Sequence, residues 1–436
     1  MVSSRFNLPQ PVKICLEKLN LGGFEAFLVG GCVRDYLLKK EAKDLDIATN
    51  ANPAEIMDIF KDYRIIETGL KHGTVTVIIH GTPIEITTYR VGKESVSNLA
   101  ADLARRDFTI NALAYHEQTG VIDYYQGIDD LSKGIINCVG KPEARFAEDG
   151  LRILRAVRFA SVLSFEIGEQ TKASMFAQCS LLNRVAKERI AAELIRLLCG
   201  VNAQRIITDY VEILSVFIPE LLETKGFMQN NVYHVYDVLA HLALTVANLP
   251  PIPRLRLAGL LHDLGKPSTY SQDAGGVGHF YGHQEIGSQM AKRILLELKF
   301  DSFTIERVYS LIKHHDHTLE PNTRQIKRWL NKLSPEAFLE LICLKRADIL
   351  AQNPRFFDRL TTLQEVENIT QAILKEQACF TFRDLKINGY ELMEIGVTPG
   401  KQVGTVLNKL LGMVIDEQIE NEHEVLVQTA RRLKDD

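Results

Sequence analysis

Apolar positions in the first 140 residues alternate between helical and strand-like spacing. Apolar side chains at three- and four-residue spacing predict helices, and alternation at every second residue predicts strands. The predicted helices cover 8–20, 32–39 and 52–63, the last of them starting at an Asn cap. The predicted strands cover 24–31, 45–50, 64–69, 74–81 and 83–90. This αβαβαβββ order indicates a small mixed sheet with helices packed on it.

Beyond about residue 140 the strand-like spacing stops and helical spacing continues. Breaks in the pattern occur at 248–254 and 273–279, where proline or glycine residues gather. We therefore expect the fold class to be an α/β head followed by an all-α body. The segments with helical spacing include 144–163, 187–200, 235–249, 252–265 and 287–300.

Composition narrows the class of protein. A chain of 436 residues is too long for one ordinary core and predicts two to four domains. The net charge of −4 weakly disfavours nucleic-acid binding, although a local basic stripe is enough to contact phosphates. The seven cysteines form no CxxC pair, so neither a zinc knuckle nor a disulfide framework is indicated. Without a signal core or an apolar run of membrane length, we expect a cytoplasmic protein with no membrane partner.

A glycine pair and two aspartates mark the first candidate site. Gly30 and Gly31 stand where a predicted strand passes into a helix, and bare N–H groups at a helix start suit a polyphosphate. Arg34, one turn in, adds a cation. Asp44 and Asp46 are separated by one residue on the next strand, so both carboxylates share a face. Two like charges that close together favour a divalent metal.

A third carboxylate strengthens this interpretation. Glu85 belongs to the predicted strand 83–90 and joins the site if that strand neighbours the one carrying Asp46. A lone DxD motif is usually a solvated strand edge. The glycine pair, the arginine and the third carboxylate together favour a metal-dependent phosphate site instead.

Five motifs occur in the order typical of one enzyme family. GGCVRD followed by DLD, with RRDFTINALAY behind it, resembles the class II tRNA nucleotidyltransferases and the bacterial poly(A) polymerases. Both belong to the polymerase-β-like nucleotidyltransferase superfamily. The resemblance continues in sequence order through 123–140, 148–159 and 186–198, over about the first 200 residues.

The resemblance implies specific roles. Asp44, Asp46 and Glu85 would be the catalytic residues, with Asp44 and Asp46 holding two Mg²⁺ ions. The substrates would be CTP, ATP and a tRNA primer. The residues implied in binding the nucleotide are Gly30, Gly31, Arg34, Arg105, Arg106, Asp107, Asp149, Arg152, Arg155 and Arg158.

Base selection is implied for the motif EDGLRILRAVRF. In this family the EDxxR helix reads the Watson–Crick edge of the base, which assigns that role to Asp149 and Arg152. Residues three apart share a helix face, and an acceptor beside a donor matches C or A but not G or U. Arg155 and Arg158 continue the same face. The alternative interpretation of these arginines is a solvated basic stripe.

One departure from the family pattern concerns the segment 91–104, which is only VGKESVSNLAADLA. Relatives that add the whole CCA end usually carry a longer flexible loop here that helps the site switch from C to A. Enzymes that add only CC lack it. The sequence therefore leaves open CC addition with a separate A-adding enzyme as partner. A bacterial poly(A) polymerase also stays open.

The second candidate site is rich in histidine. Eight of the twelve histidines fall between 234 and 317, and LLHDLGKP places His262 and Asp263 side by side on a predicted helix that ends in glycine. Imidazole and carboxylate ligands suit Mn, Fe, Co, Ni or Mg better than structural zinc. The other candidate ligands are His234, His283, His314, His315 and Asp348.

This set resembles the HD phosphohydrolase superfamily. The resemblance implies a first metal held by His234, His262, Asp263 and Asp348. A second metal would take His283 and one of His314 or His315 as ligands. A metal-bound hydroxide would then attack a phosphoester such as a 2′,3′-cyclic phosphate or a phosphomonoester. His241, His279 and His317 receive no assignment.

Two alternatives remain for the histidine-rich region. One is a scaffold that binds metal without turnover. The other is a metal-dependent phosphohydrolase whose head only binds RNA. Stringent-response enzymes also pair the two domain types, but they carry the HD domain first, whereas here it comes second.

The tail completes the predicted organisation. Residues 382–411 resemble the tail of HD-containing tRNA nucleotidyltransferases. The expected parts are a nucleotidyltransferase head, a neck with base-selecting and RNA-binding helices, an HD domain and a tRNA-binding tail. Their predicted boundaries are 1–140, 141–225, 226–360 and 361–436.

Overall fold

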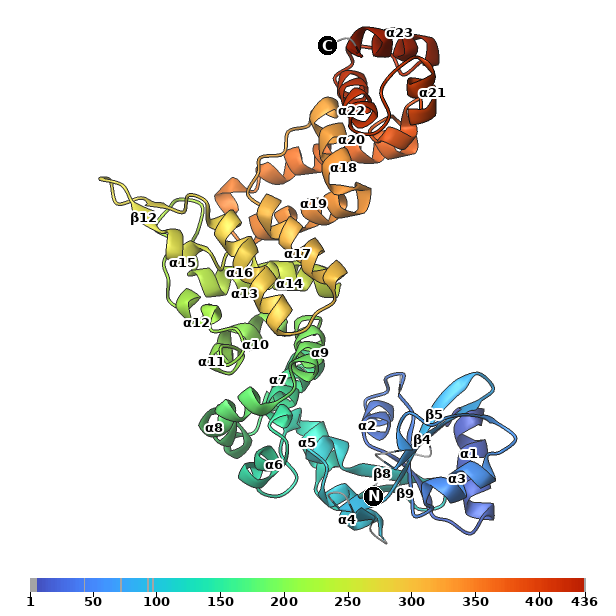
Figure 1. The fold of residues 1–436 in the computed structure, drawn as a ribbon. Coiled ribbons are helices and arrows are strands. Elements are labelled where there is room, and N and C mark those ends of the chain that lie inside the picture. Colours follow the sequence, from blue (N-terminus) through green and yellow to red (C-terminus); the bar gives the residue numbers. More distant parts are fainter. Residues whose placement is uncertain (1–5, 43, 71–72, 92–93, 96–97, 435–436) are drawn as a thin grey trace. The chain divides into compact units, whose positions relative to one another are not determined.

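The computed structural model describes residues 6–42, 44–70, 73–91, 94–95 and 98–434. Contacts divide the chain into one unit of residues 1–202 and a second of residues 203–436 (Figure 1). Among the described residues, the first unit contains the main β-sheet, and the second is helical apart from one short hairpin. The predicted fold class, an α/β head followed by an all-α body, is confirmed.

A seven-stranded mixed sheet forms the centre of the first unit. Along the sheet, β2 pairs in parallel with β5, and the other neighbours run antiparallel. The Asp46 strand and the Glu85 strand are therefore neighbours, which is the condition on which Glu85 joins the site. The order is β3 (Arg64–Ile66), β4 (Thr74–Ile79), β5 (Thr82–Thr88), β2 (Asp46–Thr49), β1 (Ala26–Val29), β8 (Leu113–His116) and β9 (Gly120–Asp123).

Successive strand residues point to opposite sides of the sheet, and both sides are covered by packed side chains. Leu28 and Ile47 pack in a cluster with α1 (Gln10–Leu21) and α3 (Pro53–Ile59). Their neighbours Val29 and Ala48 pack in a second cluster with α4 (Leu99–Ala104). The predicted Asn cap of α3 is present, since the Asn52 side chain accepts hydrogen bonds from the N–H groups of Ala54 and Glu55.

Helices complete the first unit. Helix α2 (Gly31–Leu37) follows β1, and α7 (Leu151–Leu163) packs against α9 (Lys187–Leu198) through buried leucines. The remaining elements are β6 (Arg90–Val91), β7 (Glu94–Ser95), η2 (Thr109–Asn111), α5 (Gly127–Lys133), β10 (Ile135–Ile136), α6 (Pro142–Glu148), β11 (Glu166–Ile167), α8 (Glu169–Gln178) and η3 (Cys179–Arg184).

The second unit begins inside the predicted neck 141–225, because the contact boundary falls after residue 202. Its larger part packs α13, α14, α16, α17 and α19 against one another. The elements of the second unit before the tail are α10 (Ala203–Asp209), α11 (Val211–Leu214), α12 (Glu220–Thr224), α13 (Val238–Asn248), α14 (Pro253–Leu261), α15 (Lys266–Thr269), β12 (Ser271–Gln272), β13 (Gly278–His279), α16 (His283–Glu297), α17 (Ser302–His314), α18 (Thr323–Leu333), α19 (Pro335–Leu350), η4 (Pro354–Phe356) and α20 (Arg359–Lys375).

The tail has a hydrophobic core of its own, which begins at Cys379 and includes Leu392, Leu410 and Leu426. Its elements are η5 (Phe382–Asp384), α21 (Gly389–Glu394), α22 (Lys401–Ile415) and α23 (His423–Leu433). No helix in the described part of the chain is both long and apolar enough to span a membrane.

Candidate active sites

Three carboxylates meet at the edge where β2 and β5 pair. Asp46 lies opposite Glu85 in the parallel register, and Asp44 comes two residues earlier. All three line a cavity of about 550 Å³. Burial raises the pKa of Asp46 to about 6, and the negative charges of Glu85 and Asp44 add to this rise, while Arg106 opposes it. Such a crowded set of oxygen ligands fits a divalent cation that neutralises it.

The start of α2 requires glycine at position 30. Gly30 has φ +78°, and a Cβ there would stand 2.5 Å from Nη1 of Arg106. Arg34 reaches across from α2 and donates to Oδ1 of Asn111 at 2.7 Å. Gly31 and Arg34 line the cavity, as does Arg106, whose Nε is buried without a hydrogen-bond partner.

The residues that follow α4 are held by buried carboxylates. Asp102 pairs with Arg105 at 2.8 Å and with Arg106 at 3.4 Å. Asp107 pairs with Arg155 at 2.7 Å and accepts from the amide of Asn111 at 3.1 Å. Burial raises the pKa of Asp107, but these contacts outweigh burial and hold the pKa below its ordinary value. The side chain of Asp107 therefore fixes an arginine within the pocket wall.

Asp149 and Arg152 do not share a helix face, contrary to the prediction. Asp149 lies in extended backbone after α6, and its carboxylate accepts from the N–H of Leu151 as α7 begins. It pairs with Arg189 of α9 at 2.8 Å. Arg152 instead pairs with Glu148 at 2.7 Å. Both Asp149 and Arg152 nevertheless line the cavity.

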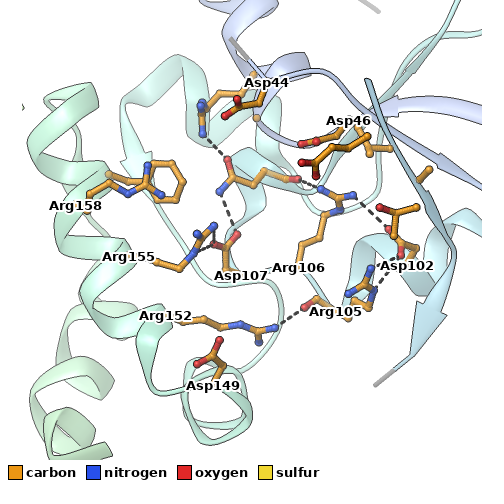
Figure 2. A pocket seen from close by; sticks show the side chains of 18 of the residues that line it. Asp44, Asp46, Asp102, Arg105, Arg106, Asp107, Asp149, Arg152, Arg155 and Arg158 are labelled. Carbon is orange, nitrogen blue, oxygen red and sulfur yellow. Dashed lines mark hydrogen bonds and ion pairs between the residues drawn. The ribbon is translucent and has the colours of Figure 1, made fainter. Parts of the chain in front are cut away.

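The pocket has two distinct ends. In Figure 2, Asp44 and Asp46 lie at one end of the view and Asp149 and Arg152 at the other. The α7 arginines 152, 155 and 158 follow one side of the pocket between them. This arrangement can hold a metal and phosphates at one end and a base at the other.

The arginines of α7 face the cavity, so the alternative of a solvated basic stripe does not describe Arg155 and Arg158. Arg158 pairs with buried Glu193 at 2.8 Å, and its guanidinium lies 3.6 Å from the centre of the Phe159 ring. Burial lowers the pKa of Arg158 to about 10, so it stays charged near neutral pH. Among the described residues the cavity is lined by eight arginines, numbered 34, 105, 106, 152, 155, 158, 189 and 196.

Sequence reasoning missed the partners on α9 and α4. Arg189 and Glu193 stand four residues apart in AKERIAAEL, which places them on one helix face. That spacing was a signal of a second charged helix at the pocket. Asp102 carried the same signal, since Arg106 follows it by four residues. Asn111 carried none, because its contact to Arg34 joins residues that are 77 apart in the chain.

A buried metal-type cluster lies in the second unit. His241 Nε2 stands 3.2 Å from His262 Nε2, 3.2 Å from Asp263 Oδ2 and 3.1 Å from Asp348 Oδ1. The donor atoms of His241, His262 and Asp348 all fall within 4.8 Å of one another. Helix α14 ends at Leu261, so the two HD residues occupy the turn after it rather than the helix itself.

The structure puts His241, which the sequence left unassigned, where His234 was expected. His241 lies on the buried face of α13, whereas His234 precedes that helix. The two rings are 5.2 Å apart. His234 instead contacts Lys266, with Nε2 3.3 Å from Nζ. A histidine at helical spacing from Val238 and Thr245, both buried, on an apolar helix was the available signal.

The other oxygen of Asp263 faces a second histidine pair. His283 Nε2 and His315 Nε2 lie 3.4 Å and 3.5 Å from Asp263 Oδ1, which is buried without a hydrogen-bond partner. His283, His315 and this oxygen of Asp263 would suit a second cation. Of the two neighbouring candidates only His315 joins the cluster, because the His314 ring packs on Trp329, 5.3 Å away.

Lys266 adds a buried cation beside the metal-type cluster. Its Nζ lies 2.6 Å from Asp263 Oδ2 and 2.7 Å from the side-chain oxygen of Gln229. Burial raises the pKa of Asp263, but His262 and Lys266 outweigh it and hold that pKa well below its ordinary value. Lys266 lines a cavity of about 440 Å³ together with His234, Asp263 and Asp348.

Three stretches of the chain match family models. Residues 26–137 match the poly A polymerase head domain, residues 164–224 the probable RNA and SrmB-binding site of polymerase A, and residues 231–353 the HD domain.

Similar proteins and structures point the same way. The chain is 32% identical to the CCA-adding enzyme of Levilactobacillus brevis over 441 residues, which cover 97% of this chain and 96% of that protein. The crystal structure of the Bacillus stearothermophilus CCA-adding enzyme in complex with CTP aligns with a TM-score of 0.74 at 25% identity, covering 98% of each chain. The Thermotoga maritima CCA-adding enzyme complexed with tRNA shares the fold, with a TM-score of 0.59 at 22% identity, covering 98% of this chain and 96% of that one.

Proposed function

The chain belongs to the CCA-adding enzyme family, and on that premise we propose that it adds C and A residues to the 3′ end of tRNA from CTP and ATP. The observation that carries this proposal is the pocket of the first unit. It combines three clustered carboxylates with eight arginines in one cavity. We further propose that the protein works in the cytoplasm, where these substrates occur together.

Asp44, Asp46 and Glu85 are the groups proposed to hold Mg²⁺. When bound, Mg²⁺ would make the primer 3′-OH a better nucleophile and neutralise the leaving pyrophosphate. The chain itself positions the nucleotide. Arg34 and Arg106 line the cavity that the carboxylates line, so both guanidiniums are placed to pair with phosphate oxygens.

Asp149 and Arg152 are proposed to read the base. C and A both present an amino group beside a ring nitrogen that accepts a hydrogen bond, so a carboxylate and a guanidinium match both. G and U present an N–H at that ring position instead. Arg189 holds Asp149 in place, and Arg152 donates to the carbonyl of Arg105 at 2.8 Å. The protein thus replaces a nucleic-acid template with two fixed side chains.

The short segment 91–104 is the reason to test the A step separately. Its described part belongs to the β6–β7 hairpin and to α4, and Asp102 on α4 ties down both Arg105 and Arg106. We propose that the pocket completes CCA without a longer loop.

Incorporation on three tRNA primers tests this proposal. The primers lack CCA, end in C or end in CC, and each receives CTP, ATP or both with Mg²⁺ before the products are sequenced. Addition of CCA that then stops is the expected result. Stopping after CC would assign the A to a separate enzyme, and long A tails would favour a poly(A) polymerase. No incorporation at all would contradict the proposal.

We also propose a phosphohydrolase activity for the HD domain. The carrying observation is Asp263, whose Oδ2 faces His241 and His262 while its unpartnered Oδ1 faces His283 and His315. Mixed imidazole and carboxylate donors favour Mn, Fe, Co, Ni or Mg as the resident ion. A bound ion would supply a hydroxide for attack on a phosphoester. Lys266 is placed to neutralise charge that develops on the phosphate.

Hydrolysis of a 2′,3′-cyclic nucleotide and of phosphomonoesters, with each of these metals, tests this second activity. We expect Asp263→Ala to abolish hydrolysis and Glu365→Ala, at an exposed glutamate of α20 in the same unit, to retain it. Absence of hydrolysis with every metal would leave a metal-binding scaffold without turnover.

A further inference from the structure

Exposed aromatic side chains gather at the mouth of the HD cavity. Tyr281 is 77% exposed and Tyr233 is 46% exposed, although large aromatic rings are usually covered. Both line the cavity that Asp263, His283 and Asp348 also line. An exposed apolar patch beside a catalytic-type cluster indicates a contact surface for a ligand.

The Tyr281 ring is held in position by a built support. It lies parallel to the His279 ring, with a centroid distance of 5.4 Å and an interplanar angle of 7°. His279 Nε2 is 3.0 Å from Asp273 Oδ2. Oδ1 of Asp273 accepts from the N–H groups of Gly275 and Val277, both at 2.9 Å. The hairpin turn therefore fixes His279, which fixes one face of Tyr281 and leaves the ring otherwise exposed.

Tyr233 stands on a separate support at the same cavity. Its ring packs on Phe356, with the centroids 4.5 Å apart, and the Arg359 guanidinium lies 5.9 Å from its centre. Arg359 also donates to Gln352, another residue of the cavity wall. Aromatic rings interleaved with arginine are typical of sites where bases of single-stranded nucleic acid stack.

We propose that Tyr281, backed by His279, is a base-stacking platform that makes the HD site prefer phosphoesters carrying a nucleobase. This inference rests on the proposed phosphohydrolase function. The base lies on Tyr281 while the ribose phosphate faces the metal-type cluster and Lys266. Water forms the new P–O bond, the bond from phosphorus to the ribose oxygen breaks, and that oxygen takes a proton. The base-bearing group is either a free nucleotide or the last residue of an RNA.

Matched substrates test the platform with the full chain and Mn²⁺. Adenosine 3′-monophosphate carries a base, glycerol 2-phosphate does not, and a short RNA with a 3′-phosphate separates the two sources. We expect Tyr281→Ala to lower kcat/KM for the base-bearing substrates about tenfold through KM, equivalent to about 1.4 kcal/mol. The kcat/KM for glycerol 2-phosphate should stay unchanged. Tyr281→Phe keeps an aromatic ring and should therefore retain the wild-type kcat/KM for the base-bearing substrates. Tyr390→Ala, at a 79% exposed tyrosine of the tail, is the matched control and should behave as wild type.

An equal fall for all substrates, or none, would overturn the platform. A photoreactive azidoadenosine 3′-monophosphate gives a readout that does not need turnover. It should label residues 277–282 in wild type and lose that label in Tyr281→Ala, while any label in the first unit stays the same in both. If no phosphoester is hydrolysed but this label appears, the platform stands and the hydrolase proposal falls. If hydrolysis occurs without the label, the platform falls alone.

Discussion

The two pockets of this chain offer different side chains as ligands for the metals proposed at each. The pocket of the first unit offers only carboxylates as ligands, and Asp44 among them is exposed. The cluster of the second unit combines buried histidines with Asp263 and Asp348. Carboxylate-only sites suit Mg²⁺, which is usually bound by one or two carboxylates together with substrate phosphates. Imidazole ligands suit a transition metal that stays resident.

Electrostatics separates the pockets in the same way. In the first unit the carboxylates repel one another, and the pKa of Asp46 rises to about 6, chiefly through burial. In the second unit burial also raises the pKa of Asp348, but His241 and His262 outweigh it and hold that pKa well below its ordinary value. At the carboxylate end of the first pocket, Arg106 therefore offsets only part of the negative charge until a cation arrives. The second pocket contains its own positive charge.

The largest expected effect comes from removing a carboxylate of the first pocket. Asp46→Ala should reduce nucleotide addition to tRNA by at least about 10³-fold, more than the loss typical of changes around a metal's ligands. Hydrolysis by the HD domain should be unchanged. Asp58→Ala, at an exposed aspartate of α3, is the control and should retain full addition. Loss of both activities in Asp46→Ala would mean that the pockets do not act separately.

The next largest effect is expected on metal affinity at the HD site, where His241 and His234 should differ. His241→Ala should lower metal affinity at the HD site by about 100-fold or more, because it removes a buried donor. His234→Ala should retain the metal, since His234 contacts Lys266 rather than the other donors. Elemental analysis of the purified proteins after dialysis measures both. Equal metal loss in the two variants would contradict the placement of His241 in the cluster.

Acidity should affect the first pocket through Asp46. The folded-state pKa of Asp46 is near 6, above the ordinary 3.8. Its protonated form therefore contributes to the free energy of unfolding below pH 3.8, and this contribution is lost as pH rises through 6. In Mg²⁺-free buffer at pH 7, Asp46→Asn should therefore stabilise the first unit by about 1–2 kcal/mol. The gain should vanish near pH 4 and in excess Mg²⁺. Hydrogen exchange of peptides from β2 and β5 measures it, and a gain independent of pH would exclude this cause.

The smallest expected effect concerns base choice. Arg189 donates to both carboxylate oxygens of Asp149, from Nη2 at 2.8 Å and from Nη1 at 3.4 Å, and the pair is partly exposed. Arg189→Ala should loosen Asp149 and reduce discrimination against UTP and GTP by about fivefold, in line with the modest strength of exposed pairs. Arg189→Lys keeps the positive charge but loses the planar pair of donors, so its discrimination should fall between those of wild type and Arg189→Ala. Misincorporation counted by sequencing decides this, and unchanged fidelity would remove Arg189 from the account.

Local sequence patterns predicted much of the first unit. Period-two alternation and the Asn52 cap depend on neighbouring residues, so the element order up to β5 could be predicted from the chain alone. The pairing of Asp46 with Glu85 required only that two predicted strands be neighbours. The motifs that resemble the family located the same pocket without any geometry.

Contacts between distant segments could not be predicted in this way. Asp149 leaves the expected helix face because its own backbone is extended between α6 and α7, and a Cβ on the next residue, Gly150, would meet the carbonyl of Leu181 at 2.9 Å. Its partner Arg189 is 40 residues away. His234 directly precedes the predicted helix 235–249 and His241 lies within it, and only the packing of α13 decides which of them reaches Asp348.

The central claim, that each unit holds its own metal centre, is tested most directly by anomalous diffraction at the manganese edge. A crystal of the full chain grown with Mn²⁺ and CTP should show a peak at Asp44 and Asp46, at bond lengths of about 2.0–2.3 Å. That peak should disappear without CTP. A second peak beside His241, His262 and Asp348 should persist in both crystals. No peak at Asp44 and Asp46 in the presence of CTP, or one at His234 instead of His241, would contradict the account.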